Sequence, residues 1–253
     1  MEGISSLGFR FAAATSAGIG YKPQNEDRIV IDAQANLYAV IDGMGGHRGG
    51  EEAAQLLAEK LRSNPTKPME AMQDAHVEMR TLPYGAGACI STVNIRKMVP
   101  TNGLNLEGIH GGDVKRLIIQ NRSTILQNGL PYFEESTDHD MVRGLSREEI
   151  RVHPYRNAVL GYISADRFKG EEMSTTLSPG SMVLLYSDGV GDNIPDAQEM
   201  VRLSLQKSAS QLLAAVQAIV EKKMTEYTDD RAKREDMKRD NWSFVAIEIP
   251  SGA

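Results

Sequence analysis

Acidic side chains stand at four points where an apolar run of the sequence meets a glycine or an asparagine. They are Glu26 and Asp27 after Asn25, Asp42 before Gly43-Met44-Gly45-Gly46, Asp188 before Gly189-Val190-Gly191, and Asp240 before Asn241. A strand end fixes the position of an acid, and a following glycine permits a tight turn that exposes carbonyl oxygens. Hard divalent cations such as Mg²⁺ and Mn²⁺ bind sets of oxygen ligands of this kind.

A single Asp-Gly pair is common turn chemistry and indicates little by itself. Repetition at four points is a stronger indication, because converging carboxylates would repel one another unless cations neutralised them or protons were held at a large cost. We therefore predict a divalent-cation site. The sequence contains no G-x-x-x-x-G-K-[ST], G-x-S-x-G, H-E-x-x-H or G-x-G-x-x-G motif, so nucleotide binding and serine hydrolysis have no support from sequence motifs.

The composition is that of a globular protein. Hydrophobic residues make up 41% of the 253 residues, enough to build a core, and the net charge of -6 argues against a duplex-binding surface. No apolar run approaches the roughly 20 residues of a membrane span, and the N-terminus lacks the pattern of a secretory signal, so we expect a cytoplasmic protein. The one cysteine, Cys89, excludes an internal disulfide and a cysteine-based zinc site, and is expected to be buried.

Hydrophobic periodicity predicts the elements that must position these acids. Alternating or continuous apolar runs predict strands at residues 9–15, 28–32, 37–41, 88–95, 114–120, 123–127, 182–187 and 243–249. Helical spacing predicts helices at 51–62, 69–79 and 212–224. The order of these elements is not the alternation of a doubly wound sheet, and no linker interrupts it, so we expect one domain. The charged stretch 229–240 is expected to be a solvated connection.

Seven motifs of the chain, in order, resemble those of the PPM (PP2C-like) family of metal-dependent serine/threonine protein phosphatases, in its compact bacterial form. The resemblance covers nearly the whole chain and is carried by Lys22-x-x-Asn25-Glu26-Asp27, Asp42-Gly43-Met44-Gly45-Gly46-His47, Gly87 with Thr92, Gly112-Asp113, Thr137-Asp138-His139, Leu184-Leu185-Tyr186-Ser187-Asp188-Gly189 and Asp240-Asn241.

The resemblance implies an α+β fold, namely an α-β-β-α sandwich of two antiparallel sheets flanked by helices. Residues 1–253 would form one PP2C-like phosphatase domain, with a flap over the cleft at about 141–168. Two Mn²⁺ or Mg²⁺ ions would lie in a cleft at one end, and a third ion would bind more weakly.

The family's metal ligands can be carried over to matching positions. Asp42 would bridge both ions, with the carbonyl group of Gly43 on one of them, while Asp188 and Asp240 would bind the other. Glu26 and Asp27 would hold metal-bound water molecules or bind the ions directly. Asp113 would belong to the third site.

The resemblance implies hydrolysis of phosphoserine and phosphothreonine by a water molecule that two cations activate, with Asp42, Asp188 and Asp240 as the catalytic residues. Lys22 takes the place of the family's phosphate-binding arginine. The expected partner is a phosphorylated protein, opposing a serine/threonine kinase. We expect a monomer with no nucleic-acid or membrane partner.

Some positions depart from the family pattern. Lys22 offers a point charge where arginine offers a planar fork, and Gly112-Asp113-Val114-Lys115 replaces the usual Gly-Asp-Ser-Arg. Met44 stands where some members carry a general-acid histidine. His47 is interpreted as a turn residue, and His139 as either a brace of the cleft or a catalytic group.

Two alternatives to a protein phosphatase remain open from the sequence. The first is a pseudophosphatase that acts as a phosphoprotein-binding or regulatory module, which the altered positions Lys22 and 112–115 favour. Retention of the acids argues for catalysis. The second is a two-metal phosphodiesterase or nuclease, which would profit from a basic track that the sequence does not show.

Overall fold

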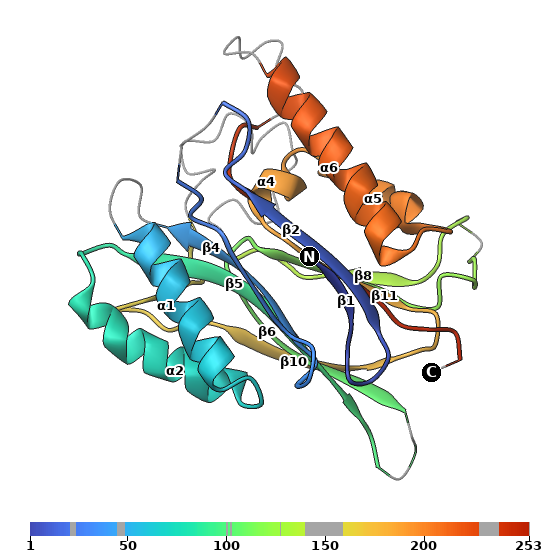
Figure 1. The fold of residues 1–253 in the computed structure, drawn as a ribbon, viewed down its shortest axis with the longest axis horizontal. Coiled ribbons are helices and arrows are strands. Elements are labelled where there is room, and N and C mark those ends of the chain that lie inside the picture. The colour runs from blue at the N-terminus through green and yellow to red at the C-terminus, as the bar shows by residue number, and fades with distance from the viewer. Residues whose placement is uncertain are drawn as a thin grey trace.

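Two antiparallel sheets lie face to face, and helices cover both outer faces (Figure 1). The computed structural model describes residues 1–20, 24–44, 49–99, 101, 103–126, 128–139, 159–227 and 238–252. This is the α-β-β-α sandwich that the sequence resemblance predicts.

The first sheet, sheet A, contains both ends of the chain. Its strands lie in the order β1 (Glu2–Ile4), β2 (Arg10–Ser16), β12 (Trp242–Glu248), β11 (Met182–Tyr186), β7 (Lys115–Ile119) and β8 (Phe133–Glu135). The pairing of β2 with β12 brings the N-terminal and C-terminal segments side by side.

The second sheet, sheet B, has the order β10 (Glu171–Leu177), β6 (Leu104–Gly111), β5 (Gly87–Lys97), β4 (Leu37–Met44) and β3 (Arg28–Asp32). A short strand, β9 (Ile163–Ser164), pairs with the start of β5. Consecutive strands β3, β4, β5 and β6 are neighbours in this sheet, so most of its pairing is local.

The helices divide between the two outer faces. α1 (Gly50–Ser63) and α2 (Pro68–Glu78) cover sheet B, whereas α5 (Ala197–Ser204) and α6 (Ala209–Glu226) cover sheet A. The single-turn helix α4 (Asp188–Gly191) follows β11, and a short 3₁₀ helix, η1 (Met79–Thr81), follows α2. No helix in the described parts of the chain is both long and apolar enough to cross a bilayer.

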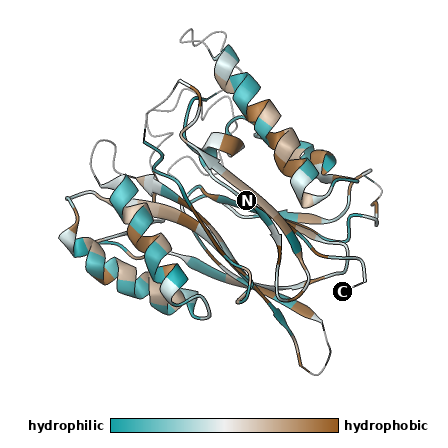
Figure 2. Ribbon diagram, in the orientation of Figure 1, coloured by the Kyte–Doolittle hydropathy of each residue, from teal (hydrophilic) through white to brown (hydrophobic). Residues whose placement is uncertain are grey.

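Strand alternation creates separate cores on the two faces of each sheet. On β11 and β12, Val183 and Val245 point into the core between the sheets, while Leu184 and Phe244 point into the core under α6. The same alternation on β4 sends Tyr38 between the sheets and its neighbours toward α1. Figure 2 shows hydrophobic residues along the strands and hydrophilic residues recurring on the helices.

The periodic helices form as predicted. The apolar face of α1 is fully buried against sheet B, and this helix has acids in its first turn and bases in its last turn, which suits the helix dipole. α6 begins with a capping box between Ser208 and Gln211, which satisfies backbone N–H groups at the helix start.

The strand predicted at 123–127 is wrong. Leu126 N–H donates to the Leu130 carbonyl, and Ile125 and Leu126 are 51% and 45% exposed, so this segment is a turn with outward apolar side chains. The left-handed backbone of Asn121 and Gly129, with φ values of 36° and 79°, reverses the chain around it. Gln127 lies outside the described residues.

The sequence did not predict β1, β6, β8, β9, β10, α4 or α5. In β6, Gly108 and His110 break the apolar alternation, and β10 is an edge strand with mostly exposed side chains. Of the flap predicted at 141–168, residues 141–158 lie outside the described part, while residues 159–168 include β9 at the edge of β5.

Replacing Leu57 by alanine tests the packing of α1. Leu57 is fully buried between α1 and sheet B, so Leu57→Ala should lower the free energy of unfolding by about 2–5 kcal/mol, measured by urea denaturation. Val77 on α2 is 58% exposed, and Val77→Ala is the matched control, with an expected change within about 0.5 kcal/mol. Equal unfolding midpoints for the two variants would contradict this packing.

Candidate functional site

Five aspartates from both sheets converge at one end of the sandwich. We call them the acidic cluster: Asp27, Asp42, Asp113, Asp188 and Asp240. In sheet B, Asp27 directly precedes β3 and Asp42 lies in β4. Asp113 lies in the segment between β6 and β7 that connects the two sheets. Asp188 is the first residue of α4, and Asp240 lies two residues before the start of β12. The charge of each of the other four raises the pKa of Asp42, which shows how close together they lie.

Burial and mutual repulsion perturb these carboxyl groups strongly. Burial raises the pKa of Asp27 to about 7, with the charges of Asp188 and Asp240 adding to the effect and hydrogen bonds from Ser187 and Ser243 opposing it. Burial, then the charges of its neighbours, raises the pKa of Asp42 well above its ordinary value. In the absence of cations, the protein must therefore hold protons or concentrate negative charge here.

A pair of serines positions Asp27, which is 1% exposed. The hydroxyl of Ser187 donates to Oδ2 of Asp27 over 2.8 Å, and the backbone N–H of Ser243 donates to the same hydroxyl oxygen over 2.9 Å. Oδ1 of Asp27 is buried and has no hydrogen-bond partner among the described residues. A buried carboxylate oxygen without a partner favours a cation or a water molecule beside it.

Asn241 ties three segments together beneath the cluster. Its Oδ1 accepts the backbone N–H of Glu26 over 2.9 Å, and its Nδ2 donates to the carbonyl oxygens of Ala17 and Gln24 over 3.0 and 3.3 Å. These contacts fix Asp240 relative to Asp27. The asparagine of the Asp-Asn motif is thus a structural residue of the site.

Two glycines of the motifs are required by close backbone approach. A methyl group at Gly43 would overlap the carbonyl oxygen of Gly50 and lie 2.9 Å from that of Glu26. At Gly189 it would overlap the carbonyl oxygen of Asn241. Neither glycine has a positive φ, so their role is the space they leave and not their conformation.

A lysine that the sequence reasoning did not single out lies among these acids. Nζ of Lys238 contacts Oδ2 of Asp188 and lies 3.2 Å from Oδ2 of Asp192 and 2.9 Å from Oδ2 of Asp240. Its signal in the sequence was hidden by the mixed charges of 229–240. Residues 229–237 of that stretch lie outside the described part, but its end is part of the site.

The donor set suits a divalent cation. It consists of buried carboxylates that raise one another's pKa, it includes an unpartnered oxygen on Asp27, and it already attracts one cationic group, Lys238. In the described parts of the chain, no three His, Cys, Asp or Glu side chains are gathered tightly enough to enclose an ion. The ammonium group of Lys238 contacts both Asp188 and Asp240.

The remaining predicted residues fall into three groups. Lys22 and His47 lie outside the described residues. Glu26 is partly buried and anchored through its backbone N–H. Cys89 is fully buried, as predicted, opposite Asp42 in the β4–β5 pair.

The Thr137-Asp138-His139 element braces the turn that carries Asp113. The backbone N–H of His139 donates to the Gly112 carbonyl over 2.9 Å, and Lys115 Nζ lies 2.6 Å from Oδ2 of Asp138. His139 is 4% exposed, and its Nε2 lies 3.1 Å from Oε1 of Glu171. These contacts favour the bracing role for His139 over the catalytic one.

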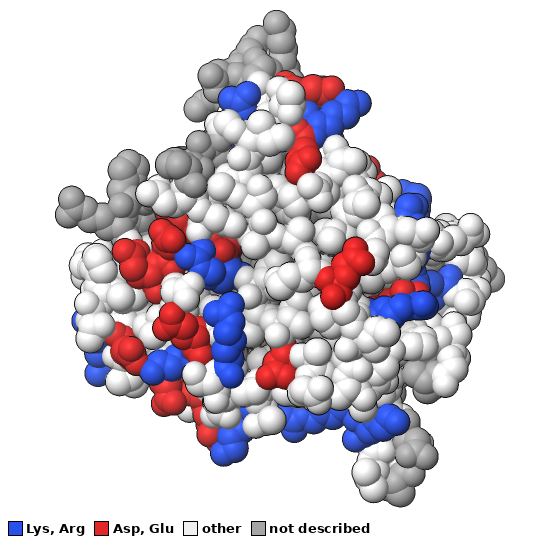
Figure 3. Space-filling model, viewed as in Figure 1, with Lys and Arg blue, Asp and Glu red and all other residues white. Residues whose placement is uncertain are grey.

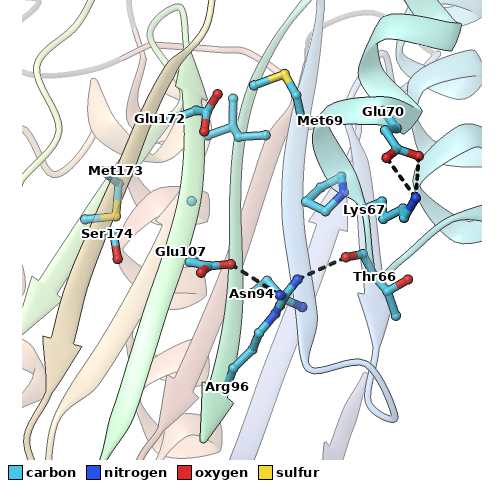
Figure 4. A pocket seen from close by; sticks show the side chains of 13 residues that line it. Thr66, Lys67, Met69, Glu70, Asn94, Arg96, Glu107, Glu172, Met173 and Ser174 are labelled. Atoms are coloured by element: carbon cyan, nitrogen blue, oxygen red, sulfur yellow. Dashed lines mark hydrogen bonds and ion pairs between the residues drawn. The ribbon is translucent and has the colours of Figure 1, made fainter. Parts of the chain in front are cut away.

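A surface cavity of about 560 Å³ lies away from the acidic cluster, between the start of α2 and strands β5, β6 and β10 (Figure 4). Arg96 crosses it, 3.6 Å from Glu107, and donates to the Thr66 carbonyl. None of the acids of the cluster lines this cavity. On the face shown in Figure 3, basic and acidic side chains are interspersed, with no continuous basic track.

Comparisons with known proteins agree with this architecture. No family model matches the chain. The chain is 27% identical over 225 residues to the serine/threonine protein phosphatase PstP of Mycobacterium tuberculosis, an alignment that covers 81% of this chain and 40% of that protein. The chain thus spans about two fifths of the length of the curated relative it matches.

Solved structures match over nearly the whole chain. The catalytic domain of PstP in complex with two manganese ions gives a TM-score of 0.72 at 18% identity, covering 96% of this chain and 98% of that one. The phosphatase Stp1 of Staphylococcus aureus gives 0.71 at 20% identity, covering 98% and 97%. The PP2C-like fold and the resemblance to bacterial PPM phosphatases are therefore confirmed, the latter as a distant relationship.

A substitution at Gly189 should test the close approach to Asn241. Gly189→Ala should lower the free energy of unfolding by about 1–3 kcal/mol because the added methyl group displaces the backbone of Asn241. Gly191→Ala, in the same helix, is the control, since its methyl group would lie 3.7 Å from the Tyr186 ring, an ordinary contact. Thermal unfolding of both metal-free variants measures the difference, and equal destabilisation would refute the steric explanation.

The stability of the metal-free protein should fall as pH rises from 5 to 7. The folded state keeps protons on Asp27 and Asp113, whose pKa values are raised from 3.8 to about 7, whereas the unfolded chain releases them near pH 4. Burial lowers the pKa of His110 to about 4 and acts in the opposite direction below about pH 6.5, but the two aspartates outweigh it.

Melting temperatures in EDTA at pH 5, 6 and 7 measure this dependence. Asp113→Asn should weaken the fall, because it removes one of the aspartates whose pKa is raised in the folded protein. A wild-type melting temperature that rises across this range would show that the cluster is not strained by its own charge.

Proposed function

We propose that this chain is a metal-dependent phosphoprotein phosphatase that hydrolyses phosphoserine and phosphothreonine. The observation that carries the proposal is the convergence of the acidic cluster from both sheets, with mutually raised pKa values. The PP2C-like fold and the two manganese ions of the PstP catalytic domain support it. We further propose that residues 1–253 act as one phosphatase domain in the cytoplasm, on phosphorylated proteins that a serine/threonine kinase supplies.

The roles follow the family pattern and the geometry together. Asp42 would hold both cations, the Gly43 carbonyl would bind one of them, and Asp188 with Asp240 would bind the other. Asp27, held by Ser187, would orient a water molecule through its unpartnered Oδ1. Glu26, whose backbone N–H is bonded to Asn241, would hold a metal-bound water molecule or bind an ion directly.

Two Mn²⁺ or Mg²⁺ ions would supply a nucleophilic water molecule near neutral pH and neutralise the phosphoryl oxygens. The protein holds its carboxylates on two rigid sheets, which fixes their separation and reduces the reorganisation that the reaction requires. We propose that Lys22 attracts the phosphate group as a point charge, with less orientation than an arginine fork would give.

A third cation site would depend on Asp113. Burial raises the pKa of Asp113 to about 7, and the charge of Asp188 adds to this effect while that of Lys238 opposes it. Lys115, in the altered Gly-Asp-Val-Lys sequence, pairs with Asp138 and so retains a brace on this turn. We propose that this third site binds its ion more weakly than the other two.

Release of phosphate from a phosphothreonine peptide, with Mn²⁺ and after exhaustive chelation, tests the proposal. Activity that disappears with the metal and returns on adding it is expected. Hydrolysis of a dinucleotide in preference to the peptide would favour a phosphodiesterase. Tight phosphopeptide binding without turnover at saturating Mn²⁺ would favour the pseudophosphatase.

Substitution of two proposed ligands should remove activity without unfolding the protein. Asp188→Asn and Asp240→Asn should each lower kcat/KM by at least about 100-fold, because each removes ligand charge without opening a core cavity. Asp74→Asn on the exposed face of α2 changes the same charge and should leave activity unchanged. Wild-type turnover by both ligand variants at saturating Mn²⁺ would contradict the assignment.

A further inference from the structure

Lys238 is held in place at its backbone as well as at its side chain. Its N–H donates to Oδ1 of Asn193 over 3.1 Å, and Nδ2 of Asn193 donates to the Lys238 carbonyl over 3.0 Å and to the Gly189 carbonyl over 2.8 Å. Asn193 is fully buried. The lysine is therefore fixed to the segment that carries Asp188, unlike a solvated side chain at the end of a charged stretch.

The side chain lies in a partly buried position, with 29% of its surface exposed, and its ammonium group meets three carboxylates. A lysine ammonium group is protonated at neutral pH. Lys238 therefore places one positive charge among Asp188, Asp192 and Asp240. Lys115 is engaged with Asp138, and Lys223 donates to the Asn193 carbonyl.

The three carboxylates differ in their surroundings. Asp188 and Asp240 are proposed cation ligands with side chains 23% and 19% exposed, whereas Asp192 lies outside that set and is 55% exposed. An ammonium group and a divalent cation cannot both occupy the space between Asp188 and Asp240. A lysine stem is flexible, so its charge can move to Asp192 without leaving the site.

We propose that Lys238 is the built-in counter-ion of the acidic cluster and competes with the divalent cation for Asp188 and Asp240. In the metal-free protein it relieves their repulsion. When a cation binds, Lys238 shifts to Asp192, and the cost of that shift lowers the cation affinity. The competition rests on the proposed function, whereas the counter-ion role in the metal-free protein does not.

Two measurements on Lys238→Met test this inference. In EDTA, the variant should melt several degrees below the wild type, because the carboxylates lose their counter-ion. In calorimetric titration, it should bind Mn²⁺ about tenfold more tightly or better, because a like charge is removed from the site. Lys222→Met on α6, with a side chain 72% exposed, makes the same charge change and should match the wild type in both.

A second variant keeps the test decisive if Lys238→Met does not fold. Asp192→Asn removes the group to which the lysine withdraws, so it should weaken Mn²⁺ binding severalfold. This effect should shrink in the Lys238→Met background if that protein is obtained. Unchanged Mn²⁺ affinity in Asp192→Asn would overturn the proposed shift.

The failures of the two proposals are distinguishable. If Lys238→Met binds Mn²⁺ with wild-type affinity, the proposed competition between Lys238 and the cation is overturned, while the proposed metal site is not. A wild type that binds no Mn²⁺ would overturn the proposed function and the competition, but the melting temperatures in EDTA would still decide the counter-ion role. Equal melting temperatures for Lys238→Met and Lys222→Met would overturn that role.

Discussion

Repulsion among the buried carboxylates of the acidic cluster acts across the interface between the two sheets. Asp27 and Asp42 belong to sheet B, whereas Asp188 and Asp240 belong to the strand ends of sheet A. The repulsion therefore pushes the sheets apart at this end, and the apolar core between them must resist it. That core runs along the inward faces of both sheets, so its hydrophobic burial can offset a local electrostatic cost.

The groups that position the acids are mostly neutral. The hydroxyl of Ser187 and the amide of Asn241 fix Asp27 and the Asp240 segment by hydrogen bonds, and Gly43 and Gly189 let the backbones approach closely. Neutral donors orient a carboxylate without cancelling its charge. The geometry of these two segments is therefore fixed by backbone, amide and hydroxyl groups, and the positive charge of Lys238 is added to that framework.

Hydrophobic periodicity and the order of the motifs were enough to predict several helices and strands and the acids of the site. The apolar face of α1 and the strand 28–32 needed no tertiary information, and the Asp-Gly motifs marked the acids that the fold brings together. Contacts between distant segments were not predictable in the same way. The bond from Ser187 to Asp27 joins residues 160 positions apart, and the environment of Lys238 depends on α4. Among the described residues, the segment predicted as a strand at 123–127 pairs with no strand of either sheet and forms a turn.

Solved structures at 18% and 20% identity share the fold, so the backbone framework tolerates extensive change in sequence. Two of the lysines that the structure describes lie beside acids of this region: Lys115 beside Asp138, and Lys238 among the acids of the cluster. An arginine fork would lock two carboxylate oxygens in one geometry. A lysine carries a compact, strongly hydrated charge on a flexible stem, so it can neutralise an acid in one state and release it in another. In the proposed competition, lysine is thus the cation better suited to balance the acids before a metal ion binds and to release them when it does.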